Sequence, residues 1–199
     1  MNSYILSLTI QHISSLFLTL FFILFFKYNN SSIPRNISII LFSIYITSLL
    51  ILVGFPTMYD IYFSPNINLK LFLSKNYTEY ILNILLFMPF GVFIPLLSKS
   101  KINFIYTVFT GIIFSIFIEL SQMFGFRATD INDIMTNTTG TVLGYFIFFI
   151  LSKIFSKIYK KNFKNIKNSG LDCFFVILIC IVSNFFISPI VVSFIFNFI

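Results

Sequence analysis

The apolar residues of this chain fall in blocks as long as a membrane-spanning helix, and this spacing constrains the fold more than any other feature. About twenty helical residues cross a hydrocarbon core that is about 30 Å thick. Lipid offers the backbone no hydrogen-bond partners, so such blocks form helices rather than open sheets. We therefore predict an all-α, polytopic transmembrane bundle, with residues 1–199 forming one membrane domain.

The blocks predict six spans, at about residues 4–26, 37–55, 80–97, 103–124, 138–152 and 172–198. The ends of the fifth span are the least clearly marked, because polar residues run into it from Asp130. Charged residues make up only 10% of the chain, whereas a soluble domain carries roughly a quarter. So few charges exclude a water-soluble surface.

The basic residues set the predicted orientation, because Lys and Arg concentrate in cytoplasmic loops. Ten of the 13 fall in alternate connections or after the fifth span: Lys27, Arg35, Lys99, Lys101, Lys153, Lys157, Lys160, Lys161, Lys164 and Lys167. Both termini are therefore expected to face outward. The net charge of +7 would suggest nucleic-acid binding in a soluble protein. In this chain the positive charge comes from the basic residues of the predicted cytoplasmic loops, and we expect no nucleic-acid partner.

Two connecting segments have patterns of their own. Residues 152–170 place lysines on one helical face, which predicts a basic amphipathic cytoplasmic segment extending the fifth span. It either rests on anionic lipid or serves only as a positive-inside anchor. In the outer connector, Ile67–Lys75 is a candidate for a short interfacial helix. That helix would be a lid over an outer site or a packed connector.

A cluster of polar residues is expected at the outer ends of the fourth and fifth spans. Its members recur at helical spacing around a short turn: Ser115, Glu119 and Gln122 before it, Arg127 in it, and Asp130, Asp133 and Asn137 after it. Ionisable groups at membrane depth are costly and by default mark function. The cluster therefore predicts a site at the outer end of the bundle.

Each member of this cluster also has a structural interpretation. Glu119 and Arg127 would neutralise each other, since a lone buried carboxylate is expensive. Asp130 would cap the following helix, and Asp133 would be the first-turn acid that the helix dipole favours. Asn137 would hydrogen-bond between helices. Together, so many polar groups in a chain with few charges favour a functional site.

Further residues extend or limit this prediction. Asn83 faces the expected cluster from the third span, or it is an interfacial residue. Pro89 lacks a backbone donor, so it frees carbonyls near residue 85 or only kinks the helix. Gly140 and Gly144 form a GxxxG motif, which predicts a close helix contact.

The two cysteines of the chain give no sign of a metal site. Cys173 and Cys180 lie seven residues apart in one apolar span, and the sequence has no CxxC motif or Cys/His cluster. The sole histidine, His12, lies in the first span, far from the polar cluster. We therefore expect no metal and no cofactor.

The polar and glycine residues together resemble the VanZ-like family. The resemblance rests on an ordered series: Asn83, Phe87, Pro89, Gly91, Ser115, Glu119, Gln122, Arg127, Asp130, Asp133, Asn137, Gly140 and Gly144. It covers residues 77–149, a VanZ-like core, and leaves the first two spans and the last without a family signature. The resemblance implies a multi-pass protein of the bacterial cytoplasmic membrane.

The family is named for a protein that lowers susceptibility to teicoplanin, a lipid-tailed glycopeptide that acts outside the membrane. The resemblance implies a contribution to teicoplanin-type resistance, through a lipoglycopeptide or lipid-linked cell-wall intermediate bound at the outer leaflet among membrane lipids. The expected ligand-binding residues are Asn83, Glu119, Gln122, Arg127, Asp130, Asp133 and Asn137. In this hypothesis Arg127 faces a phosphate or carboxylate.

Two alternatives stay open. An intramembrane enzyme that modifies a lipid or cell-wall intermediate would use Glu119 as its acid or base. In that enzyme Arg127 would stabilise developing negative charge and Asp133 would orient a partner. Against it, the cluster offers no strong nucleophile, and the sole histidine is far away in the first span. A structural or partner-binding membrane protein would use the cluster as a stabilising network. The sequence does not decide the oligomeric state.

Overall fold

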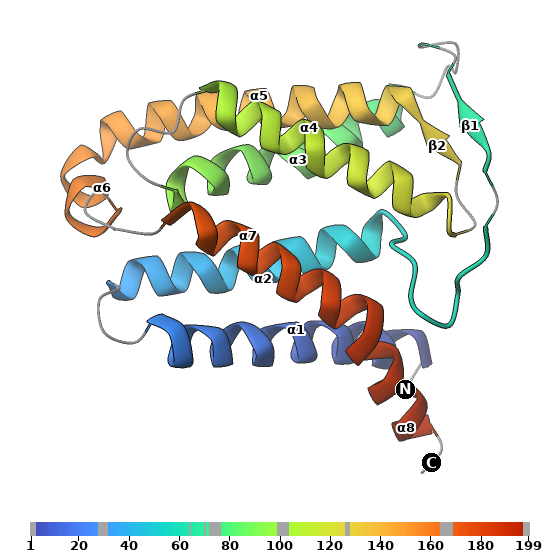
Figure 1. Ribbon diagram of the computed structural model, residues 1–199. Helices are drawn as coiled ribbons and strands as arrows, with labels where there is room; N and C mark the ends of the chain where they lie inside the picture. Colours follow the sequence, from blue (N-terminus) through green and yellow to red (C-terminus); the bar gives the residue numbers. More distant parts are fainter. Residues whose placement is uncertain are drawn as a thin grey trace.

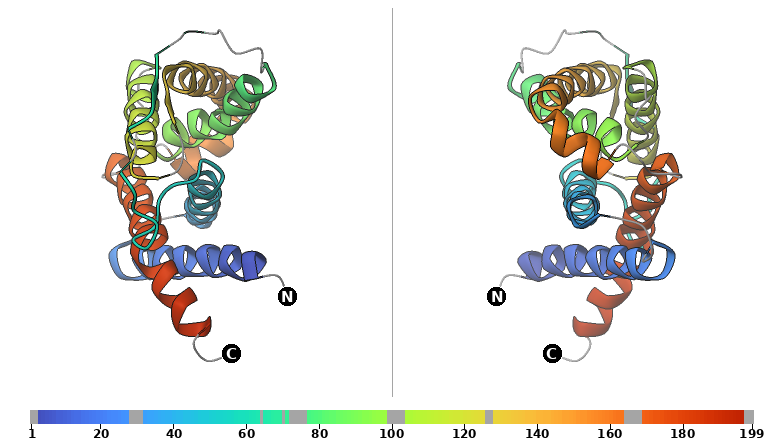
Figure 2. Two further views of the ribbon diagram at one scale, coloured as in Figure 1. Left: turned by 90° about the vertical axis from the view of Figure 1, so that its right-hand side faces the viewer. Right: turned by 90° about the vertical axis from the view of Figure 1, so that its left-hand side faces the viewer.

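The protein is a bundle of long helices, several of which cross the others at an angle (Figures 1 and 2). A computed structural model describes residues 3–27, 32–63, 65–69, 71, 77–98, 104–125, 128–163 and 169–196. The helices are α1 (Ser3–Lys27), α2 (Ile33–Leu52), α3 (Tyr77–Leu97), α4 (Phe104–Gln122), α5 (Ile131–Ile154), α6 (Ser156–Phe163), α7 (Ser169–Val182) and α8 (Ser188–Phe196). A π-helical segment, η1 (Ser183–Ile187), joins α7 to α8, and two short strands are β1 (Ile67–Asn68) and β2 (Thr129–Asp130). The predicted all-α bundle is confirmed.

Five segments of the described chain are long and apolar enough to cross a membrane: Ile33–Leu52, Tyr77–Leu97, Phe104–Gln122, Ile131–Ile154 and Asp172–Ile195. The first predicted span forms α1, a helix of 25 residues with a shorter apolar part at Ser7–Phe21. The fifth span differs most from its prediction, because α5 begins at Ile131 rather than near residue 138. Its first two turns carry polar residues that hydropathy assigned to a loop.

The ends of the helices define two ends of the bundle. Both chain termini lie at the end that carries β1 and β2 (Figure 1). Viewed along the bundle, α2 lies below the group formed by α3, α4 and α5, and α1 lies on the far side of α2 (Figure 2). The arrangement agrees with alternating spans and termini on one side. Which side of a membrane that end faces stays a prediction from the basic residues.

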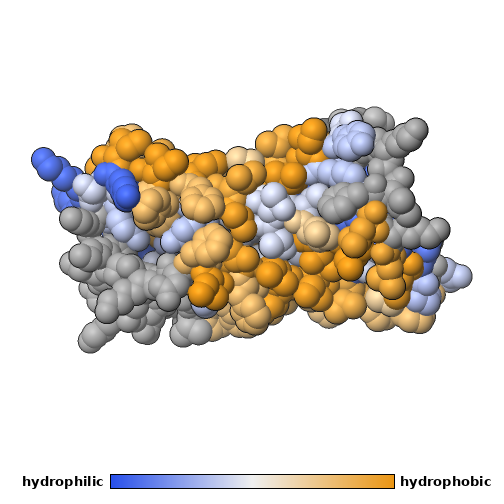
Figure 3. Space-filling model, turned by 90° about the horizontal axis from the view of Figure 1, so that it is seen from above, coloured by the Kyte–Doolittle hydropathy of each residue, from blue (hydrophilic) through white to orange (hydrophobic). Residues whose placement is uncertain are grey.

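The surface of the bundle suits contact with lipid. Large apolar side chains such as Ile105, Phe109 and Leu120 of α4 are exposed. Seen from the α5 side, apolar residues cover much of the described surface, and the most hydrophilic colour lies at the end where α5 meets α6 (Figure 3). An apolar belt of this extent is unusual on a soluble monomer, and the protein is a multi-pass membrane protein.

Three glycines bring α3 and α5 into backbone contact. A Cβ added to Gly140 would lie 2.2 Å from the Ile84 carbonyl oxygen, and one added to Gly144 would lie 2.0 Å from that of Met88. From the other helix, a Cβ on Gly91 would lie 2.1 Å from the Thr141 carbonyl oxygen. Real Cβ atoms do not approach so closely, so only glycine allows this packing. Small residues serve the same purpose at other membrane helix interfaces.

A tyrosine of α2 supports α3 near Pro89, one of the two prolines inside α3. Pro89 lacks the N–H that would bond the carbonyl of Leu85. At the neighbouring Leu86, the carbonyl accepts a hydrogen bond of 2.8 Å from the Tyr45 hydroxyl. The contact joins α2 to α3 where the latter's own hydrogen-bond ladder is interrupted.

We expect Tyr45→Phe to lower the free energy of unfolding by about 1 kcal/mol, the usual net value of one hydrogen bond. The measurement is unfolding of the purified protein in mixed micelles by titration with dodecyl sulfate. The exposed Tyr59 provides the matched control, and Tyr59→Phe should change stability by less than about 0.5 kcal/mol. Equal effects of the two substitutions would contradict a supporting role for the Tyr45 hydroxyl.

Hydroxyl groups line the contact between α1 and α2. Thr47 donates to Ser15 over 2.8 Å, and Thr19 and Ser43 share a hydrogen bond of 2.7 Å. All four residues are buried. In lipid such pairs hold helices together because a buried hydroxyl has no water to bond. α1 therefore belongs to the packed bundle even though it lies outside the predicted core region.

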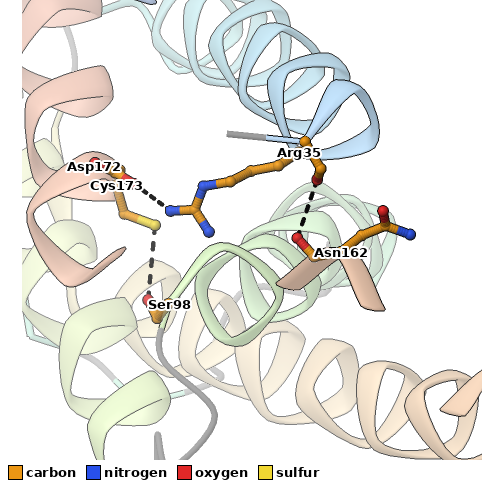
Figure 4. Close-up of polar contacts among 6 residues, drawn as sticks. Arg35, Ser98, Asn162, Asp172 and Cys173 are labelled. Carbon is orange, nitrogen blue, oxygen red and sulfur yellow. Dashed lines mark hydrogen bonds and ion pairs between the residues drawn. The ribbon is translucent and has the colours of Figure 1, made fainter. Parts of the chain in front are cut away.

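A buried ion pair joins α2 to α7 at the end opposite β1 and β2 (Figure 4). Arg35 has no exposed surface, and its Nη2 donates to Oδ2 of Asp172. The prediction that Arg35 is a loop charge is therefore wrong. α2 begins at Ile33 with Pro34 in its first turn, a position that suits proline. This early start places Arg35 inside the helix, beside the first turn of α7.

Two predictions about connections need correction. α5 ends at Ile154, and a turn at Phe155 separates it from α6. The Asn162 carbonyl accepts a hydrogen bond of 3.1 Å from Ser32, so the basic segment folds back toward the start of α2 instead of simply extending α5. In the other connector, Ile67–Asn68 is a strand rather than the start of a helix. Lys164, Lys167 and residues 72–76 lie outside the described part of the chain.

Candidate functional site

A cavity of about 550 Å³ opens between α3, α4, α5 and the end of α2, at the end of the bundle that carries β1 and β2. Apolar residues of α2, α3 and α4 form part of its wall, among them Val53, Leu82 and Ile118. Its polar lining is Asn68, Glu79, Asn83, Glu119, Gln122, Asp130, Asp133 and Asn137. The structure thus brings six of the seven predicted ligand-binding residues to one cavity. The seventh, Arg127, lies outside the described residues.

Glu119 holds the end of α4 against the start of α5. Its carboxylate accepts a hydrogen bond of 2.8 Å from the backbone N–H of Asp130. Its carbonyl oxygen accepts another, of 2.9 Å, from the Thr129 hydroxyl. The side chain is only 2% exposed, so it is buried in the wall of the cavity. Glu119 therefore both lines the cavity and fixes the strand that precedes α5.

Asp130 organises the start of α5. It is the N-cap residue, and its Oδ1 accepts a hydrogen bond of 2.8 Å from the backbone N–H of Asn132. Its Oδ2 accepts a second, of 3.0 Å, from the side-chain amide of Asn68. The strands β1 and β2 pair in parallel and place Asn68 opposite Asp130. Asp130 thus has the capping role expected from the sequence while it also faces the cavity.

Asn83 and Asp133 connect α3 to α5 across the cavity wall. The Asn83 amide donates a hydrogen bond of 2.8 Å to Oδ1 of Asp133. Asp133 is the acid in the first turn of α5, where the helix dipole favours a negative charge. The close glycine packing of the same two helices, deeper in the bundle, fixes the distance across which this bond forms.

Among the α5 residues that line the cavity, Asn137 lies farthest from the start of the helix. Its side-chain amide donates a hydrogen bond of 2.9 Å to the Ser115 hydroxyl of α4. The residue is 3% exposed, and its Oδ1 finds no hydrogen-bond partner among the described residues. A buried carbonyl oxygen without a partner costs free energy. An unpartnered buried polar atom in a native structure needs an explanation, and a bound ligand that donates a hydrogen bond to it is one such explanation.

Gln122 joins the cavity to the end of α2. Its amide donates a hydrogen bond of 2.9 Å to the Val53 carbonyl, which would otherwise be unsatisfied at a helix end. Gly54, which follows Val53 in the chain, has a φ of 70°, a conformation that glycine adopts without strain. This turn directs the chain away from α2 and into the connector between α2 and α3, which supplies Asn68.

Two cavity residues were missing from the predicted set. Glu79 lies on α3 four residues before Asn83, so helical spacing was a signal that could have found it. Asn68 had no such signal, because it lies in an irregular connector. Only the pairing of β1 with β2 brings it to the cavity.

The lining of the cavity combines polar and apolar side chains. Carboxylates and side-chain amides line it beside apolar residues, a combination that is typical of ligand pockets. The described residues form no group of three His, Cys, Asp or Glu side chains that could hold a metal ion. The Ser115 hydroxyl accepts a bond from Asn137, and no described histidine lines the cavity to activate it.

Known proteins match the part of the chain that contains this cavity. A sequence profile of the VanZ/LLP1 family matches residues 12–152. Protein VanZ of Enterococcus faecium is 32% identical over 120 residues, which are 57% of this chain and 74% of that protein. No solved structure matches the chain. The profile covers well over half of the sequence and every candidate site residue, so the chain belongs to the VanZ/LLP1 family.

Proposed function

We propose that this protein binds an amphipathic ligand at the outer leaflet of the bacterial cytoplasmic membrane and contributes to teicoplanin-type resistance. The ligand is a lipid-tailed glycopeptide or a lipid-linked cell-wall intermediate. The observation that carries the proposal is the cavity, which gathers six predicted polar residues from three helices at one end of an apolar bundle. Family membership supports the link to resistance, and the basic loops support the outward orientation.

The shape of the cavity suits a ligand that is partly polar and partly apolar. Its volume of about 550 Å³ lies in the range of small-molecule sites, about 300–1,000 Å³. Polar residues from α3, α4 and α5 meet the polar part of such a ligand. The exposed apolar surface of α4 beside it offers a place for an acyl tail among membrane lipids.

Binding explains the position of Glu119 better than acid–base catalysis does. One of its carboxylate oxygens accepts the Asp130 backbone N–H. A group that must gain and lose a proton during turnover would weaken this bond in each cycle. In a binding site the same carboxylate keeps its charge and its position. The enzyme hypothesis remains an outcome of the test below.

We expect Glu119→Gln to reduce teicoplanin tolerance in a susceptible Gram-positive host while leaving vancomycin susceptibility unchanged. Glutamine retains an oxygen for the Asp130 N–H, so the fold should persist. Loss of the charge should weaken ligand binding at least about tenfold, because hydrogen bonds to charged groups contribute about 1.5–3 kcal/mol and about 1.4 kcal/mol corresponds to a factor of ten. The measurement is the inhibitory concentration of each antibiotic at equal membrane levels of the wild type and the variant.

Asp60→Asn is the matched control, because Asp60 is an exposed carboxylate outside the lining of the cavity. It should leave tolerance unchanged. If neither protein raises tolerance above that of the empty host, the antibiotic role does not extend to this chain. If Glu119→Gln abolishes tolerance but still binds the glycopeptide, Glu119 acts as an acid or base, and the binding hypothesis is wrong.

A further inference from the structure

We propose that the group selected by this cavity is a protonated primary amine carried by the amphipathic ligand. The proposal rests on the proposed function and names the chemistry that the site recognises. Two independent observations lead to it: the charge of the cavity, and the direction of its hydrogen bonds.

The first observation is the excess of negative charge. Four carboxylates line the cavity: Glu79, Glu119, Asp130 and Asp133. None of the described lining residues is Lys, Arg or His. From residue 115 to residue 144 the sequence contains one basic residue, Arg127. When Lys70 and Lys75 of the connector that supplies Asn68 are counted with Arg127, the four lining acids still outnumber three basic residues. Partial burial strengthens the attraction of these acids for a cation.

The second observation is that each side-chain amide of the cavity already donates one hydrogen bond to the protein. Asn83 donates to Asp133, Gln122 to the Val53 carbonyl, and Asn68 to Asp130. The Asn137 amide nitrogen likewise donates to Ser115. One N–H of each of these amides is therefore already bonded to a protein acceptor. The group that fits such a site is one that brings its own donors.

The Asn137 carbonyl oxygen identifies where this donor is needed. It is buried, and it has no partner among the described residues. An ammonium group carries three N–H donors and no acceptor. It would satisfy this oxygen and retain two donors for carboxylates. A neutral hydroxyl could supply the oxygen with one donor but would gain little from the surrounding negative charge.

A bound divalent metal is a poorer match to the same residues. Metal sites bring several carboxylate or imidazole ligands to within about 2–2.6 Å of one ion. The described residues form no group of three such side chains. Organic ammonium groups need only hydrogen-bond distances and tolerate a wider spread of acceptors, which is the arrangement observed.

The test compares two probes that differ at one nitrogen: dodecyl glucosaminide, which carries a free amine, and its N-acetylated form, which is neutral and carries an added acetyl group. Binding is measured by calorimetry on the purified full chain in nanodiscs of phosphatidylglycerol. We expect the amine to bind at least about tenfold more tightly. Asp133→Asn keeps an oxygen for the Asn83 bond and should reduce this preference. Asn137→Leu, which removes the carbonyl oxygen, should reduce it too.

Asp60→Asn again provides the control and should leave the preference unchanged. Equal binding of the two probes by the wild type would overturn the proposal. So would a preference that persists in Asp133→Asn and Asn137→Leu, or one that Asp60→Asn removes, because the amine would then sense only the charged surface. Gel filtration of each variant shows whether it is folded, and Asp133→Asn remains informative if Asn137→Leu is not.

The source of the amine is decided by a competition arm. Nanodiscs that contain phosphatidylethanolamine should weaken binding of the probe if the natural ligand is an amine-bearing lipid headgroup. Unchanged binding indicates an amine on a lipoglycopeptide or cell-wall intermediate. Tolerance that depends on Glu119 without amine preference would leave the proposed function intact and contradict this inference. Amine preference without any effect on tolerance would support this inference and contradict the antibiotic role in the proposed function.

Discussion

Gly144→Ala is expected to destabilise the bundle by at least about 3 kcal/mol, the upper part of the usual range for overpacking. The added Cβ would lie 2.0 Å from the Met88 carbonyl oxygen and 2.9 Å from the Gly91 Cα. Both atoms belong to the backbone of α3, so no side-chain rotation can relieve the clash. α5 would have to move away from α3 along its length.

The same movement should impair the cavity. Asn83 and Asp133 bond across the interface of these two helices, and the bond would lengthen as the helices separate. Gly125→Ala is the matched control, because the nearest atom to its added Cβ would be the Gln122 carbonyl oxygen at 3.6 Å. Unfolding by dodecyl sulfate titration measures both variants. If Gly144→Ala is as stable as Gly125→Ala, α3 and α5 do not pack in backbone contact.

Asp172→Asn is expected to cost about 3–5 kcal/mol, the typical cost of leaving one partner of a buried ion pair uncompensated. Arg35 is fully buried, and its Nε and Nη1 have no hydrogen-bond partner among the described residues. Among the described residues, Asp172 is therefore the acid that compensates the positive charge of Arg35. Because α7 lies beyond the matched residues 12–152, this pair joins the last span to the family core.

The double variant Arg35→Met, Asp172→Leu tests the cause of that loss. Replacing a buried ion pair by apolar residues of similar volume is often neutral or stabilising. The double variant should therefore be more stable than Asp172→Asn alone. Unfolding of the three proteins in mixed micelles gives the comparison. A loss within about 1 kcal/mol for Asp172→Asn, or an equally unstable double variant, would show that the ion pair does not hold α7 in place.

Most of the helices could be predicted from the sequence because their cause is local. An apolar block of sufficient length has to satisfy its own backbone in lipid, whatever its neighbours are. Helical spacing likewise places Ser115, Glu119 and Gln122 on one face before any packing is known. Hydropathy placed the start of the fifth span near residue 138, because the residues after Asp130 are polar. The capping pattern of Asp130 and Asp133 indicated the earlier helix start that the structure has.

The candidate site combines local and tertiary causes. The spacing of polar residues on the fourth and fifth spans indicated a shared outer site, and the structure places six of them around one cavity. Asn68 could not be predicted to join them. Its place depends on the pairing of two short strands from distant parts of the chain, and neither strand has a pattern strong enough to predict.

The sequence by itself determined the class of the protein, its apolar spans and the faces on which polar residues lie, because these follow from chain length, hydropathy and helical periodicity. The tertiary structure alone decided which faces meet. It buried Arg35 against Asp172, which the sequence separates by more than half the chain. It also turned the amides of Asn83 and Gln122 toward protein acceptors. Long-range contacts of this kind depend on the packing of whole helices, and helix packing is not encoded in any single segment.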